Sequence, residues 1–118
     1  MARVVAHVPD LLFGSKVQGM LTAGGHEVAL VGSESAVRDE IAAGDVLVVD
    51  LTDDDAAGIA LLEGLKASDD IADVRTLAFY SHVDADVRTR AIAAGFDLVV
   101  PRSRMAREGS ALVDRLVA

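Results

Sequence analysis

Short apolar runs alternate with segments of helical periodicity five times along the chain. The runs are continuous and rich in valine, and they cover residues 3–8, 27–31, 45–50, 74–80 and 97–100. Continuous apolar runs are typical of strands that are buried on both faces of a parallel sheet. The pattern therefore predicts five parallel strands, with helices covering both faces of the sheet.

The segments between the runs have helical spacing and helix-boundary residues. The first is expected to stop at the glycine pair 24–25, and the second places Val37 and Ile41 one turn apart on the same helix face. Aspartates suited to helix N-termini come before the third and fourth segments, at residues 53–55 and at Asp84. Each apolar run is therefore expected to be followed by an amphipathic helix.

Five strand–helix units in series predict one doubly wound α/β domain over residues 1–118. Parallel neighbours need right-handed crossovers, so we expect three α/β/α layers. A flavodoxin-like strand order, 2-1-3-4-5, fits five strands. The working crevice of this architecture lies outside the carboxyl ends of the strands. The residues expected at that edge are Val8, Pro9, Asp10, Asp50, Thr52, Asp53, Tyr80, Ser81, His82 and Arg102.

Composition and charge narrow the class of protein. Hydrophobic residues make up 52% of the chain, which is enough for a folded core, and no apolar run approaches the length of a membrane span. The formal net charge is -8, with 14 acids and 4 bases up to residue 73 and 5 acids and 7 bases after it. The overall charge argues against nucleic acid as a partner. Without a signal peptide pattern, we expect a cytoplasmic protein.

The sequence lacks the motifs of several common chemistries. The chain has no cysteine, no G-x-G-x-x-G turn after the first strand and no G-x-x-x-x-G-K-[ST] loop, so thiolate chemistry and the usual phosphate cradles are excluded. His7, His26 and His82 are too dispersed to form a ligand set by local spacing. We expect His7 and His26 to be packing or surface residues, whereas His82 falls at the functional edge.

Asp50 ends the third apolar run and is followed eight residues later by Gly58, in the stretch GDVLVVDLTDDDAAGIALLEGLK. With the five-unit pattern, the AIAAGFD turn before the last strand and a base at Arg102, this stretch resembles the receiver domains of bacterial response regulators. The resemblance extends over essentially the whole chain. It implies that Asp50 is the phosphoacceptor position and that Arg102 stands where the family has a lysine.

The resemblance also implies a magnesium ion between the acceptor and an acidic pair after the first strand. That pair is replaced by Val8 and Pro9, so a metal site would need Asp10 together with Asp50. The family's switch hydroxyl falls at Tyr80 or at the neighbouring Ser81, and the sequence leaves open which of the two faces the crevice. Arg102 keeps the positive charge of the family's lysine, but its planar guanidinium group differs from the compact lysine ammonium in reach and geometry.

These departures favour an atypical receiver, or pseudo-receiver, which signals by protein–protein interaction without a cofactor and is not an enzyme. The structural role expected for Asp50 is to cap its loop or to pair with Arg102. One alternative is a phosphoaccepting single-domain response regulator that uses Asp50 and Mg²⁺, and another is a flavodoxin-like protein that binds a small ligand through His82, Ser81 and Arg102.

The resemblance implies a partner or dimer surface on the fourth helix, the fifth strand and the fifth helix. Five arginines fall on these elements, Arg88, Arg90, Arg104, Arg107 and Arg115. A basic face on an acidic protein suits an acidic protein surface or a second copy of the chain. No further domain follows residue 118 in this sequence, so any output is expected to be exerted by binding. The excess of arginine over lysine hints at a bacterial source.

Overall fold

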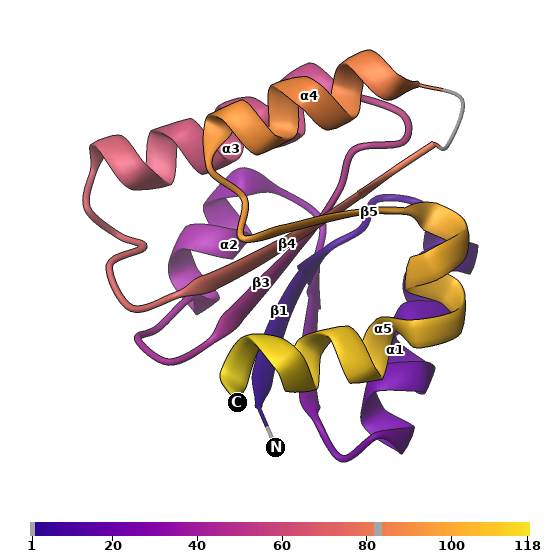
Figure 1. The fold of residues 1–118 in the computed structure, drawn as a ribbon. Helices are drawn as coiled ribbons and strands as arrows, with labels where there is room; N and C mark the ends of the chain where they lie inside the picture. The colour runs from indigo at the N-terminus through magenta and orange to yellow at the C-terminus, as the bar shows by residue number, and fades with distance from the viewer. Residues whose placement is uncertain (1, 82–83) are drawn as a thin grey trace.

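All five strands pair in one parallel sheet. The computed structural model describes residues 2–81 and 84–118, and its strand order is β2-β1-β3-β4-β5 (Figure 1). The strands are β1 (Arg3–His7), β2 (Glu27–Val31), β3 (Val46–Asp50), β4 (Arg75–Tyr80) and β5 (Leu98–Pro101). The predicted fold class and strand order are confirmed, and each strand end lies within one residue of the predicted run.

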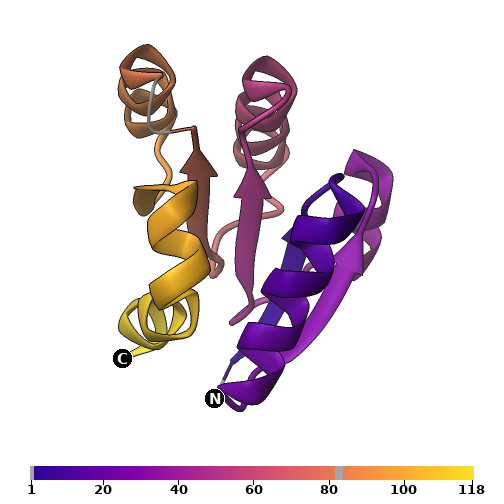
Figure 2. The same cartoon turned by 90° about the vertical axis from the view of Figure 1, so that its right-hand side faces the viewer.

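Five helices cover the two faces of the sheet. They are α1 (Leu11–Ala23), α2 (Glu34–Glu40), α3 (Asp55–Ala67), α4 (Ala85–Ala94) and α5 (Arg102–Val117). Helices α1 and α5 pack on one face, while α2, α3 and α4 pack on the other (Figures 1 and 2). None of the helices described for residues 2–81 and 84–118 is long and apolar enough to cross a bilayer.

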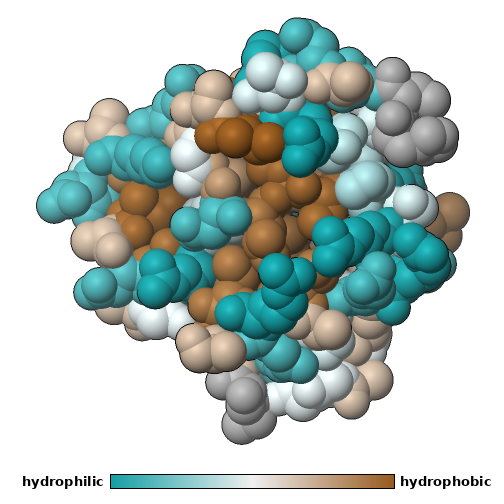
Figure 3. Space-filling view, viewed as in Figure 1, coloured by the Kyte–Doolittle hydropathy of each residue, from teal (hydrophilic) through white to brown (hydrophobic). Residues whose placement is uncertain are grey.

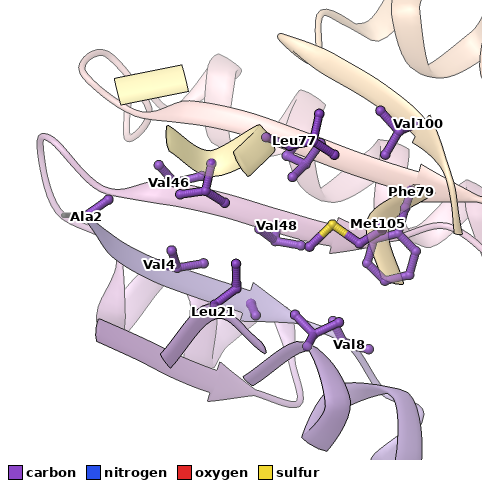
Figure 4. Packing of buried hydrophobic residues seen from close by; sticks show 14 of the residues in the cluster. Ala2, Val4, Val8, Leu21, Val46, Val48, Leu77, Phe79, Val100 and Met105 are labelled. Atoms are coloured by element: carbon purple, nitrogen blue, oxygen red, sulfur yellow. The ribbon is translucent and has the colours of Figure 1, made fainter. Parts of the chain in front are cut away.

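The core is split by the sheet into two layers. Successive side chains of a strand point to opposite faces, so Val4 packs under α1 and α5 whereas Val5 packs under the other three helices. Both are fully buried. In Figure 4, Met105 of α5 lies beside Val48 and Phe79 of the central strands. The continuous apolar runs of the sequence are thus explained by burial of both faces.

Two helix boundaries differ from their predicted form. Helix α2 ends at Glu40, and Ile41 is its C-cap with extended backbone, so Val37 and Ile41 do not share a helix face as predicted. The link between them is the Ile41 amide, which donates to the Val37 carbonyl at 2.9 Å. Asp84 does occupy the N-cap of α4, but its side chain accepts no hydrogen bond from that helix.

Gly58 lets α3 approach the third strand closely. A Cβ atom at this position would lie 2.3 Å from Cδ2 of Leu51 and 3.0 Å from Cγ1 of Val49, distances that the packed core does not allow. The glycine eight residues after Asp50 is therefore required by helix–sheet packing. This close approach sets where the loop 51–54 and the first turn of α3 lie relative to Asp50.

A buried histidine links the start of the chain to the last helix. The side chain of His26 is fully buried, and its Nδ1 accepts a hydrogen bond from the Ala2 amide at 3.0 Å. Its Nε2 lies 3.0 Å from Oδ1 of Asp114 in α5, although no hydrogen bond joins these two atoms. His26 is thus a packing residue, as expected from the sequence.

Candidate functional site

Asp50 lies at the carboxyl end of the central strand β3, where the predicted crevice is. The residue is 7% exposed, and its Oδ1 accepts a hydrogen bond from the Thr52 amide at 2.8 Å and another from the Thr52 hydroxyl. This carboxylate therefore caps the loop that follows it, which is one of the two structural roles expected for it. The other expected role, an ion pair with Arg102, is absent from the described contacts.

Asp10 is the N-cap of α1. Its Oδ1 accepts from the amides of Leu12 at 3.0 Å and Phe13 at 3.1 Å, and its Oδ2 lies 3.4 Å from Nη2 of Arg102. The hydrogen bond from the Phe13 amide is the main cause of a lowered pKa for Asp10, and Leu12 and Arg102 lower this pKa further. The carboxylate is thus held ionised by the start of α1 and by α5.

Arg102 begins α5 and turns toward α1. Its guanidinium carbon lies 4.0 Å from the centre of the Phe13 ring, within the range of a cation–π interaction. Phe13 also contacts Phe79, with ring centres 5.2 Å apart. The one cation predicted at the crevice is therefore engaged by a ring and a carboxylate of the α1 segment, and not by Asp50.

The described residues do not fit a magnesium site of the receiver type. Val8 is buried and apolar, Pro9 is exposed and has no anionic group, and Asp10 directs its oxygens to the α1 amides and to Arg102. Within residues 2–81 and 84–118, no three histidine or acidic side chains are placed to hold a metal together. Hard cations need several oxygen ligands at once.

Two hollows lie at this edge of the sheet, and Asp50 lines the second of them. The first, which we call the hydroxyl pocket, has a volume of about 410 Å³ and is lined by Phe13, Thr52, Ser81, Arg102, Ser103 and Ala106. Tyr80 points the other way, into the core beneath α3 and α4, where it is 6% exposed. Of the two residues that the sequence left open, Ser81 faces the crevice. His82, the third predicted residue of this loop, lies outside the described residues.

The second hollow, which we call the acidic pocket, was not predicted. Its volume is about 330 Å³, and it is lined by His7, Pro9, Gly32, Asp50, Asp53, Asp54, Ala57 and Gly58. Asp50 and Asp53 were expected at this edge, whereas His7 was expected to be a packing or surface residue. His7 is the last residue of β1 and pairs in register with Val49 of β3, which places it next to Asp50.

The imidazole of His7 has no partner for one of its nitrogens. Its Nδ1 is buried and forms no hydrogen bond to the described residues. Burial lowers the pKa of His7, and the nearby charge of Asp50 offsets part of this effect. At neutral pH His7 is therefore uncharged and lines the acidic pocket as a neutral polar group.

Known structures share this fold throughout the chain. The receiver domain of the Francisella response regulator 1452 superposes with a TM-score of 0.82 at 15% identity, covering 99% of this chain and 97% of that one. The chemotaxis response regulator CheY4 of Vibrio cholerae gives 0.80 at 15% identity, covering 98% of both chains. The BeF3-activated DrrB receiver domain gives 0.81 at 18% identity, covering 99% of this chain and 97% of that one.

The sequence matches no family model and no curated protein. The likeness therefore lies in the three-dimensional structure: this chain has the fold of the receiver domains of two-component signalling.

Proposed function

We propose that this chain is an atypical receiver-like signalling domain, which acts by protein–protein interaction and without magnesium-dependent phosphorylation of Asp50. The observation that carries the proposal is the engagement of Asp10 by two α1 amides and Arg102. A divalent ion opposite Asp50 needs a second carboxylate beside the end of β1, and Asp10 is the first acid that follows β1 along the chain. Under this proposal the chain does not turn over a metabolite.

The position of Arg102 supports the same proposal. In phosphoryl transfer, a cation near the acceptor stabilises the charge on the transferred group. Here the guanidinium lies over Phe13 and contacts Asp10, so reaching a phosphoryl group on Asp50 means giving up both interactions. The residue that would respond to phosphorylation is thus already held by other contacts.

The partner surface that we propose consists of α4, β5 and α5. β5 is an edge strand with half-buried Leu98 and Val99, and Ile92 of α4 is 48% exposed. Figure 3 shows hydrophobic surface in the middle of this face, where β5 runs between α4 and α5, with hydrophilic residues around it. A hydrophobic centre with a polar rim is typical of protein interfaces.

The five arginines of this face are not equally available. Arg90 is bonded to Asp55 at 2.5 Å and to Asp86 at 3.1 Å, and Arg104 lies 3.5 Å from Glu108. Arg88, Arg107 and Arg115 are exposed and take part in none of the ion pairs between described residues. We therefore propose that these three arginines supply the attraction to an acidic partner or to a second copy of the chain.

A phosphoaccepting response regulator is the second candidate, and one observation favours it. Asp50 occupies the tip of the central strand, and Ser81, Thr52 and Arg102 line the hydroxyl pocket next to it. A hydroxyl and a cation there resemble the groups that contact a phosphoryl oxygen in receivers.

Incubation with acetyl phosphate and Mg²⁺, followed by intact-mass measurement, separates the two candidates. We expect no mass gain. A gain of one phosphoryl group that is lost in Asp50→Asn would overturn the proposal in favour of the second candidate. Amide NMR spectra with Mg²⁺ and beryllofluoride test the same site without turnover, and we expect no shifts centred on residues 50–58. The Asp50→Asn variant is the control in both measurements.

A further inference from the structure

The strand β2 forms one edge of the sheet, and β1 is its only neighbouring strand among the described residues (Figure 2). Apart from the ladder with β1, no backbone–backbone hydrogen bond between described residues involves residues 28–31. An edge strand presents a row of unpaired N–H and C=O groups, with which a further strand can pair. The outer side of β2 is therefore able to accept one more strand.

The edge at β2 lacks the usual protection along most of its length. Proteins commonly protect an edge strand with proline, with charged side chains or by making the strand very short. The opposite edge strand, β5, has four residues and ends on Pro101, which has no N–H to donate. In contrast, β2 has five residues, and after Glu27 its sequence is entirely apolar, Val-Ala-Leu-Val. These four side chains are half-buried, so an added strand would cover them further.

An exposed leucine lies beside the same edge. Gly14 of α1 faces Leu30 of β2, since a Cβ atom at Gly14 would lie 3.4 Å from Cδ2 of Leu30. Leu11 comes three residues before Gly14 and therefore lies on the same flank of α1. The side chain of Leu11 is 81% exposed. A strand added beside β2 would have Leu11 and Leu30 as apolar neighbours on the α1 face of the sheet.

The charges at this edge are acidic, and they decide which partner fits. Glu27 begins β2, and Glu34 begins α2 three residues after the strand ends. Residues 10–40 include two bases: Arg38, which already pairs with Glu34 and a second acid, and Lys16, which lies on a different flank of α1. Two copies of β2 paired antiparallel would bring Glu27 of each copy toward Glu34 of the other. A partner that carries positive charge at its ends is therefore favoured over a second copy of this chain.

We infer that the outer edge of β2 binds an extended segment of a partner protein, which adds a further strand to the sheet. Apolar side chains at alternate positions of the segment lie against Leu11 and Leu30, and a lysine or arginine at each end pairs with Glu27 or Glu34. In this mode of recognition, backbone hydrogen bonds supply affinity and alternate side chains supply specificity. The inference goes beyond the proposed function, because it concerns the edge of the sheet opposite to the α4, β5 and α5 surface.

Amide NMR titration of the full chain tests the inference with the synthetic peptide Lys-Val-Thr-Val-Thr-Val-Lys, blocked at both ends. Its valines alternate with threonines, so an extended conformation has one apolar side. We expect saturable shifts centred on residues 11, 14 and 27–34. A form of the peptide that is N-methylated at all its central residues keeps the side chains but cannot donate backbone hydrogen bonds, and it is expected not to bind. The peptide with glutamate in place of both lysines should bind about tenfold more weakly or less.

Two neighbouring leucines give a matched pair of variants. Leu11→Ser removes the apolar contact beside β2 and should weaken the lysine peptide about fivefold. The control is Leu12→Ser. Leu12 is 87% exposed but lies two residues from Gly14 and so on another flank of α1, and its replacement should leave the affinity unchanged. Both side chains are largely exposed, so both variants are expected to fold.

Four outcomes overturn the inference. The first is the absence of saturable shifts at millimolar concentrations of the lysine peptide, and the second is a set of shifts centred on α4 and β5 instead of β2. The third is equal binding of the N-methylated peptide, which shows that no strand is added. The fourth is a concentration-dependent shift of residues 28–31 without any peptide, which makes a second copy of the chain the occupant of this edge.

Discussion

The guanidinium of Arg102 lies over the ring of Phe13, 4.0 Å from its centre, and so joins the first residue of α5 to the first turn of α1. The same guanidinium contacts Asp10, the N-cap of α1, at 3.4 Å. This cation thus bridges the two helices that cover one face of the sheet. This arrangement explains why the base next to the crevice is not directed to Asp50.

Replacing Phe13 should weaken this junction. Phe13→Leu removes the cation–π contact and the ring contact with Phe79 from a site that is 8% exposed, and we expect a loss of about 1–3 kcal/mol in the free energy of unfolding. Urea unfolding measures the loss. Leu12→Ala, at a neighbouring site that is 87% exposed, is the control and should change the free energy by less than about 0.5 kcal/mol. Equal losses in the two variants would contradict the assigned contacts.

The charge of Asp10 should stabilise the protein in a pH-dependent way. Its pKa lies below the ordinary value of 3.8, so its stabilising effect is complete above that value and is lost as the pH falls through the lowered pKa. Asp10→Asn keeps a capping side chain but loses the attraction to Arg102. We expect a lower urea midpoint than in the parent protein at pH 7 and no difference in strong acid. A difference that is the same at both pH values would show that the charge is not involved.

Gly58→Ala should be strongly destabilising because of the close approach of α3 to β3. The added Cβ would lie 2.3 Å from Cδ2 of Leu51, and overpacking of this kind costs about 1–3 kcal/mol. Gly19→Ala is the matched control, since Gly19 is an exposed position of α1 where no atom lies within 4 Å of the added Cβ. That variant should gain about 0.5–1 kcal/mol from helix propensity. Thermal unfolding of both variants checks the contrast, and a neutral Gly58→Ala would contradict the packing.

His7 should make stability fall as the solution becomes acidic. Burial lowers its pKa in the folded protein, so below the ordinary imidazole value of 6.5 the unfolded chain binds a proton that the folded chain does not. We expect a smaller change in urea midpoint between pH 7.5 and pH 5.5 in His7→Gln than in the parent protein. His26 is present in both proteins, so the comparison isolates His7. Equal changes would show that His7 titrates as it does in the unfolded chain.

The sequence predicted the sheet well because burial on both faces leaves a direct pattern in the strands. Runs such as residues 45–50 and 74–80 are mostly apolar whichever way their side chains point, and a flavodoxin-like strand order is one that fits five strand–helix units. The ends of the helices were predicted less well. Ile41 continues the helical spacing of α2, but its backbone is extended, since spacing alone does not show where a short helix stops.

The sequence predicted which edge of the sheet carries the site, but it did not predict the two pockets at that edge. Counting along β4 could not decide between Tyr80 and Ser81, because the decision depends on the α3 and α4 side chains that bury the Tyr80 ring. His7 was missed for a related reason. Its place beside Asp50 depends on the pairing of β1 with β3, which brings together residues 43 positions apart in the sequence. The signal that could have identified His7 is its position at the end of a predicted central strand.

The buried imidazole of His26 has a consequence for how α5 can move. It accepts from the Ala2 amide and lies against Asp114 near the far end of α5, while Arg102 holds the near end of the same helix to Phe13. Both ends of α5 are thus in contact with other elements, at positions 12 residues apart. A shift of the whole helix would therefore change the contact with His26 at the strand beginnings and the contact with Phe13 at the crevice together.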